Sequence, residues 1–291
     1  MIKCIAIDMD GTLLTAGQTV TEENVAAIKK AQEKGIEVVI ATGRSYQEAS
    51  FVLNQYGLKC PVICVNGAEI RSNEGKIIDS NPLSKSAAQK AAAALDENNV
   101  YFEVYTNKGM YTKDTDKAIS TIADIFQTAN PDTPIEKIHK AAEDRLDQGF
   151  VKKIDDYEKL FTNDEHDLYK LLAFSTDPIR LEAAMQSLEK IEGLAVSSSG
   201  YENLEITDKN AQKGIALKKF VEERGISLQE TMAIGDNYND LSMFQLVGRS
   251  VAMGNADENI KAQCHFVTAT NEESGVGKAI FDVLKEAAYK K

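Results

Sequence analysis

The stretch that decides the fold is Cys4-Ile5-Ala6-Ile7-Asp8-Met9-Asp10-Gly11-Thr12. A short apolar run followed by two carboxylates and a glycine is typical of a buried strand with the acids at its carboxyl end. Open α/β sheets place their chemistry at such strand ends. Because side chains alternate along an extended backbone, Asp8 and Asp10 are expected to face one small volume. Two like charges so close together require a cation or a shared proton.

Helices and strands alternate after this opening. The expected elements are a helix from the Thr21 cap to Gly35, a strand over residues 36–41, a helix from the Ser45–Glu48 capping box to about Gly57, and a strand over residues 62–65. The pattern resumes at Lys213, with further strands over residues 232–234 and 250–253. This order predicts the α/β class, with a doubly wound core built on a parallel sheet and right-handed crossovers.

Residues 83–208 break that rhythm. A helix followed by two strands appears at both ends of the stretch, and helical segments are expected over much of residues 115–161. We therefore predict a core domain of residues 1–82 and 209–291, interrupted by an inserted α+β domain of residues 83–208.

The composition limits the class of protein. The chain has 291 residues, of which 43% are hydrophobic and 27% charged, as in soluble globular proteins of about two domains. No apolar run approaches the roughly 20 residues that span a bilayer, and no signal peptide is evident, so a cytoplasmic location and no membrane partner are expected. The net charge of −12 argues against nucleic acid as a partner but allows a small phosphorylated ligand. Nothing indicates an obligate protein partner.

The four cysteines do not suggest a disulfide framework or a zinc site. Cys4, Cys60 and Cys64 lie in or beside strand-like apolar runs, where a thiol behaves as a small buried hydrophobe. The three histidines are far apart in sequence and lack the spacing of zinc ligands.

Four polar clusters stand at predicted strand ends or helix starts: Asp8–Thr12, Thr42–Arg44, Lys213 and Asp236–Asp240. Since the carboxyl ends of parallel strands share one edge of the sheet, we expect these clusters to converge. Three acids, an amine and small hydroxyl or amide groups make a site for Mg²⁺ and phosphate. An EF-hand calcium loop starting at Asp8 is disfavoured, because its twelfth position is Thr19 instead of glutamate.

The same residues carry a family resemblance. The motif DxDGT at Asp8, TGR at Thr42, KGxAL at Lys213 and GDxxND at Gly235 closely resemble the motifs of the haloacid dehalogenase (HAD) superfamily of phosphohydrolases, in the family's order and over nearly the whole chain. More narrowly, the chain is similar to the Cof-type group, subfamily IIB, in which a large C2-type cap is inserted after the third strand. The resemblance thus implies that residues 83–208 form a cap.

The resemblance also implies roles for single residues. Asp8 would be the nucleophile that forms an aspartyl-phosphate, and Asp10 the acid/base that protonates the leaving alcohol and then activates water. Mg²⁺ would be held by Asp8, the backbone carbonyl of Asp10, and Asp236. Asp240 would support these ligands without binding the ion itself. The groups that would hold the phosphoryl oxygens are the Met9 amide, Thr42, the Gly43 amide, Lys213 and Asn239. Arg44 and Asn66 are candidates that either touch the substrate or only shape their loops.

The leading hypothesis is a Mg²⁺-dependent phosphatase of small phosphomonoesters. Sugar phosphates, pyridoxal phosphate, and flavins or their phosphorylated precursors all fit the family. One alternative is a phosphosugar mutase, which would return the phosphoryl group to the sugar. Another is a non-catalytic protein that binds a phosphorylated metabolite, although such a protein would be expected to lose one of the acids that are present here. Specificity is expected to reside in residues 83–208, with the loop Ser199–Tyr201 as a candidate.

Overall fold

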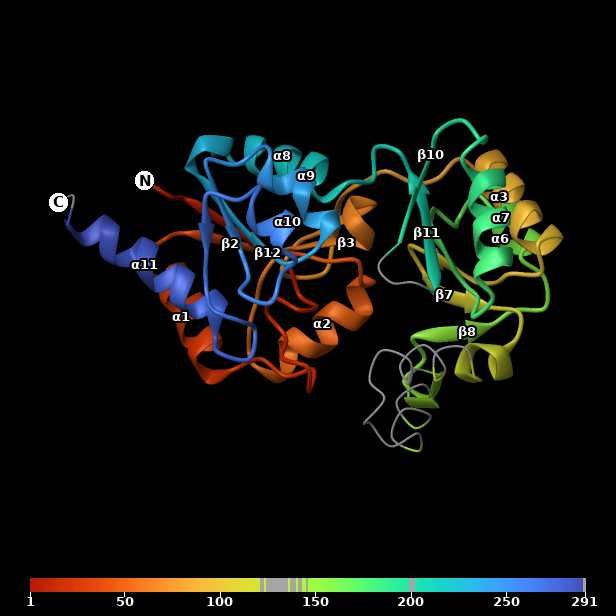
Figure 1. Ribbon diagram of the computed structural model, residues 1–291, viewed down its shortest axis with the longest axis horizontal. Coiled ribbons are helices and arrows are strands. Elements are labelled where there is room, and N and C mark those ends of the chain that lie inside the picture. The colour runs from red at the N-terminus through yellow and green to blue at the C-terminus, as the bar shows by residue number, and fades with distance from the viewer. Residues whose placement is uncertain are drawn as a thin grey trace. The chain divides into compact units, whose positions relative to one another are not determined.

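The computed structural model describes residues 1–120, 123, 136, 140, 143, 144, 146–198 and 202–289. It consists of two compact units: unit 1, formed by Met1–Ser80 with Ala211–Lys291, and unit 2, formed by Asn81–Asn210. Each unit has its own sheet (Figure 1). The candidate loop Ser199–Tyr201 lies outside the described residues.

Strand β1 (Cys4–Ile7) lies inside the sheet of unit 1, between β12 and β2. In the described part of the chain, the eight strands of this sheet follow the order β14-β13-β12-β1-β2-β3-β4-β5. Pairing is parallel from β14 to β3 and antiparallel from β3 through β5, which confirms the predicted parallel core. The other strands are β2 (Glu37–Ala41), β3 (Val62–Cys64), β4 (Glu69–Arg71), β5 (Ile77–Ser80), β12 (Thr231–Gly235), β13 (Arg249–Ala252) and β14 (Phe266–Val267).

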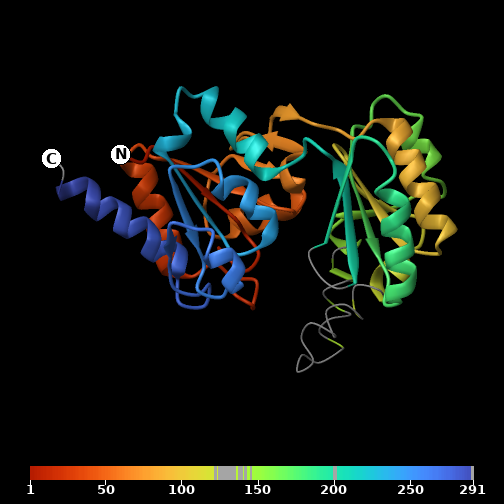
Figure 2. The ribbon, with the colours of Figure 1, turned by 45° about the horizontal axis from the view of Figure 1, so that its top comes forward.

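Helices cover both faces of this sheet, as a doubly wound fold requires (Figures 1 and 2). Along β1, Cys4 and Ala6 belong to the core cluster that packs beneath α8, α9 and α10, while Ile5 and Ile7 alternate with them and are equally buried. The opposite face carries α1, α2 and α11, and α1 packs against α11. The helices are α1 (Glu22–Glu33), α2 (Tyr46–Gln55), α8 (Lys213–Glu222), α9 (Leu241–Phe244), α10 (Glu258–Lys261) and α11 (Gly275–Tyr289).

Both predicted helix caps are confirmed. The Thr21 hydroxyl accepts a bond from the Asn24 N–H at the start of α1. The Ser45–Glu48 capping box is complete at the start of α2, where each side chain bonds the other residue's backbone N–H. Such caps satisfy N–H groups that a helix cannot pair internally.

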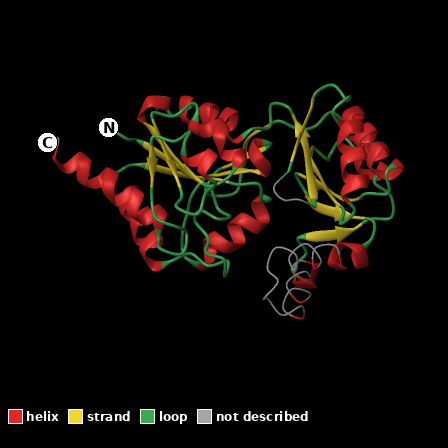
Figure 3. Cartoon of the chain, in the orientation of Figure 1, coloured by secondary structure: helices red, strands yellow, loops and turns green. Residues whose placement is uncertain are grey.

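Unit 2 is an α+β unit in which helices pack on one face of a mainly antiparallel sheet (Figure 3). Among the described residues, six strands follow the order β10-β11-β9-β6-β7-β8. The strands are β6 (Tyr101–Thr106), β7 (Gly109–Thr112), β8 (Val151–Lys153), β9 (Leu168–Phe174), β10 (Leu194–Ser197) and β11 (Asn203–Asp208), and the helices are α3 (Lys85–Glu97), α6 (Glu158–Phe161) and α7 (Pro178–Leu188).

Strand β8 corrects one expectation, because it falls in the stretch expected to be helical. It pairs in parallel with β7, from which it is about forty residues distant in sequence, and Met110 lies opposite Val151. A three-residue strand has too few positions to display a period, so only its distant partner identifies it.

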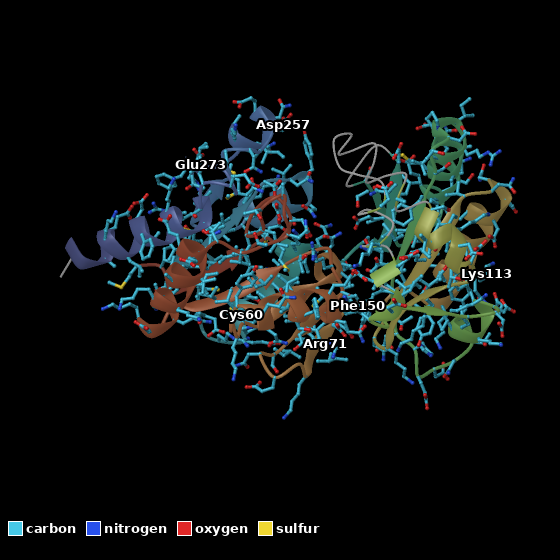
Figure 4. All side chains as sticks on the ribbon, turned by 90° about the horizontal axis from the view of Figure 1, so that it is seen from below. Cys60, Arg71, Lys113, Phe150, Asp257 and Glu273 are labelled. Carbon is cyan, nitrogen blue, oxygen red and sulfur yellow. The ribbon has the colours of Figure 1, made fainter. Side chains whose placement is uncertain are left out.

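Two predictions from composition can also be compared with the structure. All four cysteines are free, and Cys4, Cys60 and Cys64 are buried, as expected for small hydrophobes (Figure 4 labels Cys60). No helix in the described ranges is both long and apolar enough to cross a bilayer.

Candidate active site

Four charged side chains of unit 1 meet beyond the carboxyl ends of β1 and β12. Asp8 directly follows β1, Asp236 directly follows β12, Asp240 ends the 3₁₀ turn that comes next, and Lys213 is the first residue of α8. The Lys213 ammonium donates to Asp8 Oδ1 at 2.5 Å and to Asp240 Oδ1 at 2.7 Å. Carboxylate oxygens of the three acids lie within 4.8 Å of one another. Segments more than 200 residues apart therefore converge as the parallel topology predicts.

Two glycines allow the backbone to approach these acids. A Cβ atom on Gly11, whose φ is +74°, would lie 2.3 Å from Asp236 Oδ2. A Cβ atom on Gly235 would lie 2.3 Å from Asp240 Oδ2. Any other residue at either position would displace a carboxylate of the cluster.

The cluster is buried and carries an excess of negative charge. The exposed fractions of Asp8, Lys213 and Asp240 are 5%, 1% and 0%, and two of the three clustered carboxylates, those of Asp8 and Asp240, bond the Lys213 ammonium. Burial raises the pKa of Asp8 well above its usual range, although Lys213 counteracts this effect. Burial also raises the pKa of Asp236 to about 6, opposed by the Thr12 hydrogen bond and reinforced by the charge of Asp240. Burial would lower the pKa of Lys213, but Asp240 and Asp8 raise it, so the amine stays charged.

The donor set fits a hard divalent cation. Both oxygens of Asp240 accept protein hydrogen bonds: Oδ1 from Lys213, and Oδ2 from the backbone N–H groups of Asp236 at 3.0 Å and Asn237 at 3.1 Å. Asp8 Oδ1 accepts a hydrogen bond from the Lys213 ammonium. Asp236 Oδ1 accepts one from the Thr12 hydroxyl at 2.8 Å. Excess carboxylate charge with raised pKa values is what a divalent cation would offset, and oxygen ligands are those that Mg²⁺ prefers.

The loops after β2 and β3 are joined to the loop after β12 through Asn66. The Asn66 N–H donates to the Thr42 carbonyl at 2.9 Å, and Asn66 Oδ1 accepts from Asn239 Nδ2 at 3.2 Å. A Cβ atom on Gly43 would lie 3.2 Å from the same Asn66 oxygen. Oδ1 of Asn239 is buried, with no hydrogen-bond partner among the described residues. Thr42, Gly43, Asn66 and Asn239 are thus brought together.

Asp10 has a different environment from Asp8. Its side chain is 51% exposed and forms a two-point ion pair with Arg44. Between the two aspartates, the Met9 side chain is buried and its carbonyl accepts from the N–H groups of Thr12 and Leu14. The acids gathered around Asp8 are therefore Asp236 and Asp240, whereas the Asp10 carboxylate pairs with the Arg44 guanidinium.

Sequence reasoning missed three contacts in this region. Thr12 bonds Asp236, although its place in the DxDGT motif was a usable signal. Ser242 Oγ accepts from the Gly214 N–H at 3.0 Å, and the Gln18 carboxamide oxygen accepts from Arg44. Neither Ser242 nor Gln18 belongs to a pattern that would have identified it.

Comparisons with known proteins are consistent with this geometry. A family model described as haloacid dehalogenase-like hydrolase matches residues 5–280. The phosphatase YwpJ of Bacillus subtilis is 39% identical over 285 residues, covering 97% of this chain and 100% of YwpJ. The 5-amino-6-(5-phospho-D-ribitylamino)uracil phosphatase YwtE of the same organism is 37% identical, covering 97% of this chain and 98% of YwtE. A solved haloacid dehalogenase-like hydrolase from B. subtilis superposes with a TM-score of 0.86 at 38% identity, covering 96% of this chain and 99% of that one.

Proposed function

The chain belongs to the haloacid dehalogenase-like hydrolases and is a phosphatase, and we propose that it hydrolyses small phosphomonoesters by way of a phosphorylated Asp8. The observation that carries this proposal is the contact of the buried Asp8 carboxylate with Lys213, beside Asp236. An Asp8 oxygen would attack phosphorus while the bond to the leaving oxygen breaks, and water would later release phosphate from the aspartyl-phosphate.

The residues around Asp8 would bind and orient the transferred group. Lys213 holds Asp8 Oδ1, and the other oxygen, Oδ2, would attack the substrate. The Thr42 hydroxyl, the backbone N–H groups of Met9 and Gly43, and the Asn239 carboxamide would donate to the phosphoryl oxygens, whose charge they stabilise in the transition state. Asn66 is proposed to keep the Thr42 and Asn239 loops in register, because it bonds both.

Asp10 would carry the proton. It would protonate the departing alcohol oxygen and then accept a proton from the attacking water. Its exposed position beside the cluster leaves its carboxylate accessible to a substrate oxygen.

Asp8, the backbone carbonyl of Asp10, and Asp236 would hold a Mg²⁺ ion, which when bound offsets the repulsion between the anionic nucleophile and the phosphate dianion. Asp240 would keep Lys213 and the loop after β12 in place without contacting the ion, because both its oxygens already accept protein hydrogen bonds.

The substrate class proposed is a phosphorylated flavin precursor, because YwtE, at 37% identity, is named for 5-amino-6-(5-phospho-D-ribitylamino)uracil. Residues 83–208 would act as a cap that contacts the leaving group and excludes water. The proposed location of the reaction is the cytoplasm. A screen of this compound against sugar phosphates, pyridoxal 5′-phosphate and riboflavin 5′-phosphate tests the assignment. Preferential cleavage of a compound outside the flavin-precursor class would contradict it.

The nucleophile is tested by Asp8→Asn. This variant is expected to fold as the wild type by circular dichroism and to release phosphate at least about 1,000-fold more slowly in Mg²⁺, because an amide cannot form the phosphoenzyme. Asp282→Asn, on an exposed part of α11, is the matched control and should keep wild-type turnover. Substantial Mg²⁺-dependent phosphate release by folded Asp8→Asn would refute the mechanism.

A further inference from the structure

The carboxylate of Asp10 is held by a single guanidinium. Arg44 Nε donates to Asp10 Oδ2 at 2.8 Å, and Arg44 Nη2 donates to Asp10 Oδ1 at 2.5 Å. Two parallel bonds between planar groups fix direction as well as distance. The half-exposed Asp10 side chain would otherwise be free to rotate, so this pair determines where its oxygens lie.

Arg44 is itself fixed from three sides. Its Nη2 also donates to the Gln18 carboxamide oxygen, its N–H donates to Thr42 Oγ1 at 3.1 Å, and its carbonyl accepts from the Val65 N–H at 3.0 Å. Gln18 and Val65 both adopt left-handed backbone conformations, with φ of +58° and +49°. Such conformations are costly for residues other than glycine and persist only where the surroundings impose them.

The guanidinium of Arg44 is directed at Asp10 and Gln18 in this arrangement. Three of its five N–H groups are engaged, two with Asp10 and one with Gln18. Lysine could not reproduce this contact, because an ammonium is a point donor without the planar fork. These bonds favour a role toward Asp10 over a role as a phosphate ligand.

We propose that Arg44 is the positioning residue for Asp10, and that Gln18 in turn orients Arg44. The Arg44 fork holds the Asp10 carboxylate in one direction, toward the oxygen to which Asp10 must deliver a proton. This inference rests on the proposed function, in which Asp10 protonates the leaving group.

Leaving-group dependence tests the proposal. p-Nitrophenolate departs with little need of a proton, whereas an alkoxide departs only when protonated. Arg44→Gln is expected to lower kcat by about 10- to 100-fold for the alkyl phosphomonoester that the wild type cleaves fastest, and by less than about 3-fold for p-nitrophenyl phosphate. Arg44→Lys should fall between the wild type and Arg44→Gln, and Gln18→Ala should show the same pattern more weakly.

A second experiment compares Arg44→Gln with and without Asp10→Asn. If Arg44 acts through Asp10, Arg44→Gln in the Asp10→Asn background causes no further loss of kcat on the alkyl substrate. Arg71→Gln is the matched control, because Arg71 makes a similar two-point pair with Glu69 on β4 (Figure 4 labels Arg71). It should leave the ratio of the two kcat values unchanged.

Opposite outcomes overturn the proposal. Equal loss on both substrates, or a rise in KM for both together with weaker inhibition by inorganic phosphate, would assign Arg44 to phosphate binding. An additive loss in the double variant would also refute it. If Arg44→Gln does not fold, Arg44→Lys and Gln18→Ala carry the same comparison. Absence of phosphate release by the wild type would contradict the proposed function, whereas an active wild type with an unchanged kcat ratio in the variants contradicts only this inference.

Discussion

Lys213 links the acid that follows β1 to an acid in the segment after β12. Its ammonium pairs with both Asp8 and Asp240, and its side chain has no exposed surface. Replacing it with methionine removes the ammonium that pairs with the buried Asp8 and Asp240, beside the partly buried Asp236. We expect Lys213→Met to lower the free energy of unfolding by about 3–5 kcal/mol, the cost of leaving buried carboxylates unpaired.

Urea unfolding of Lys213→Met measures this loss. Lys218→Met is the matched control on the same helix, because the Lys218 side chain is 53% exposed and lies 3.9 Å from Glu222. It should change stability by less than about 0.5 kcal/mol. Equal stabilities of the two variants would show that the buried pairs contribute nothing.

Among the elements, α8 positions Lys213 by packing closely on α9, to which Ser242 belongs. A Cβ atom on Gly214 would lie 2.0 Å from the Ser242 carbonyl oxygen. Replacing glycine by alanine inside a helix usually stabilises it, by about 1 kcal/mol. Here we expect the opposite sign: Gly214→Ala should destabilise the protein by about 1–3 kcal/mol, because α8 must move away from that carbonyl.

Thermal unfolding of Gly214→Ala tests this sign. Gly17→Ala is the control, since a Cβ atom there would meet only the Thr15 hydroxyl, at an ordinary 3.7 Å. A Gly214→Ala protein more stable than the wild type would show that helix propensity prevails over the close contact.

Several elements could be predicted from local sequence because the determinants are local. The Ser45–Glu48 box and the apolar run of β1 need no distant partner to be recognised. Strand β8 and the left-handed Val65 and Asn66 depend on distant contacts: β8 on its pairing with β7, Val65 on the Arg44 carbonyl, and Asn66 on the Thr42 carbonyl. No pattern within a few residues could reveal β8 or the left-handed Val65, whereas Asn66, followed by Gly67, carries a local turn signal.

At the scale of the whole molecule, the proposed metal site makes the stability of unit 1 depend on pH. Without a divalent cation, Asp236 has a pKa of about 6 in the folded state against an ordinary 3.8, so the folded state retains a proton that the unfolded chain releases. Stability should therefore fall as pH rises from about 4 to 6, by up to about 3 kcal/mol. A Mg²⁺ ion at the proposed site would take the place of this proton and should remove most of the loss of stability.

Urea unfolding at pH 4.5 and 6.5, in chelator or in Mg²⁺, measures this effect. Asp236→Asn isolates it from the other carboxylates, because an amide does not titrate. In chelator, the variant should lose the part of the fall that belongs to Asp236, while the part due to Asp8, whose pKa burial also raises, remains. It should also lose the gain from Mg²⁺. The same pH dependence in the variant and the wild type would exclude Asp236 as its source.

Topology made the convergence of the site predictable. Once the strands were expected to be parallel, Asp8, Lys213 and Asp236 had to share one edge of the sheet. The distribution of partners was not predictable, because it depends on side-chain directions. Asp8 accepts from the Lys213 ammonium, whereas Asp10, two residues later, accepts from the Arg44 guanidinium. Gln18 contacts Arg44 from a loop that has no recognisable motif.

The position of β1 inside the sheet has a consequence for biosynthesis. A nascent chain leaves the ribosome from its N-terminus, so β1 first has β2 as its only neighbour and exposes an open edge, a surface prone to wrong pairing. Its second neighbour, β12, is made only after all of residues 81–210, which form a continuous unit of the chain. Translation that stalls before Gly235 would therefore leave β1 with one unprotected edge and Asp8 without Asp236 and Asp240, so the acidic cluster could not form.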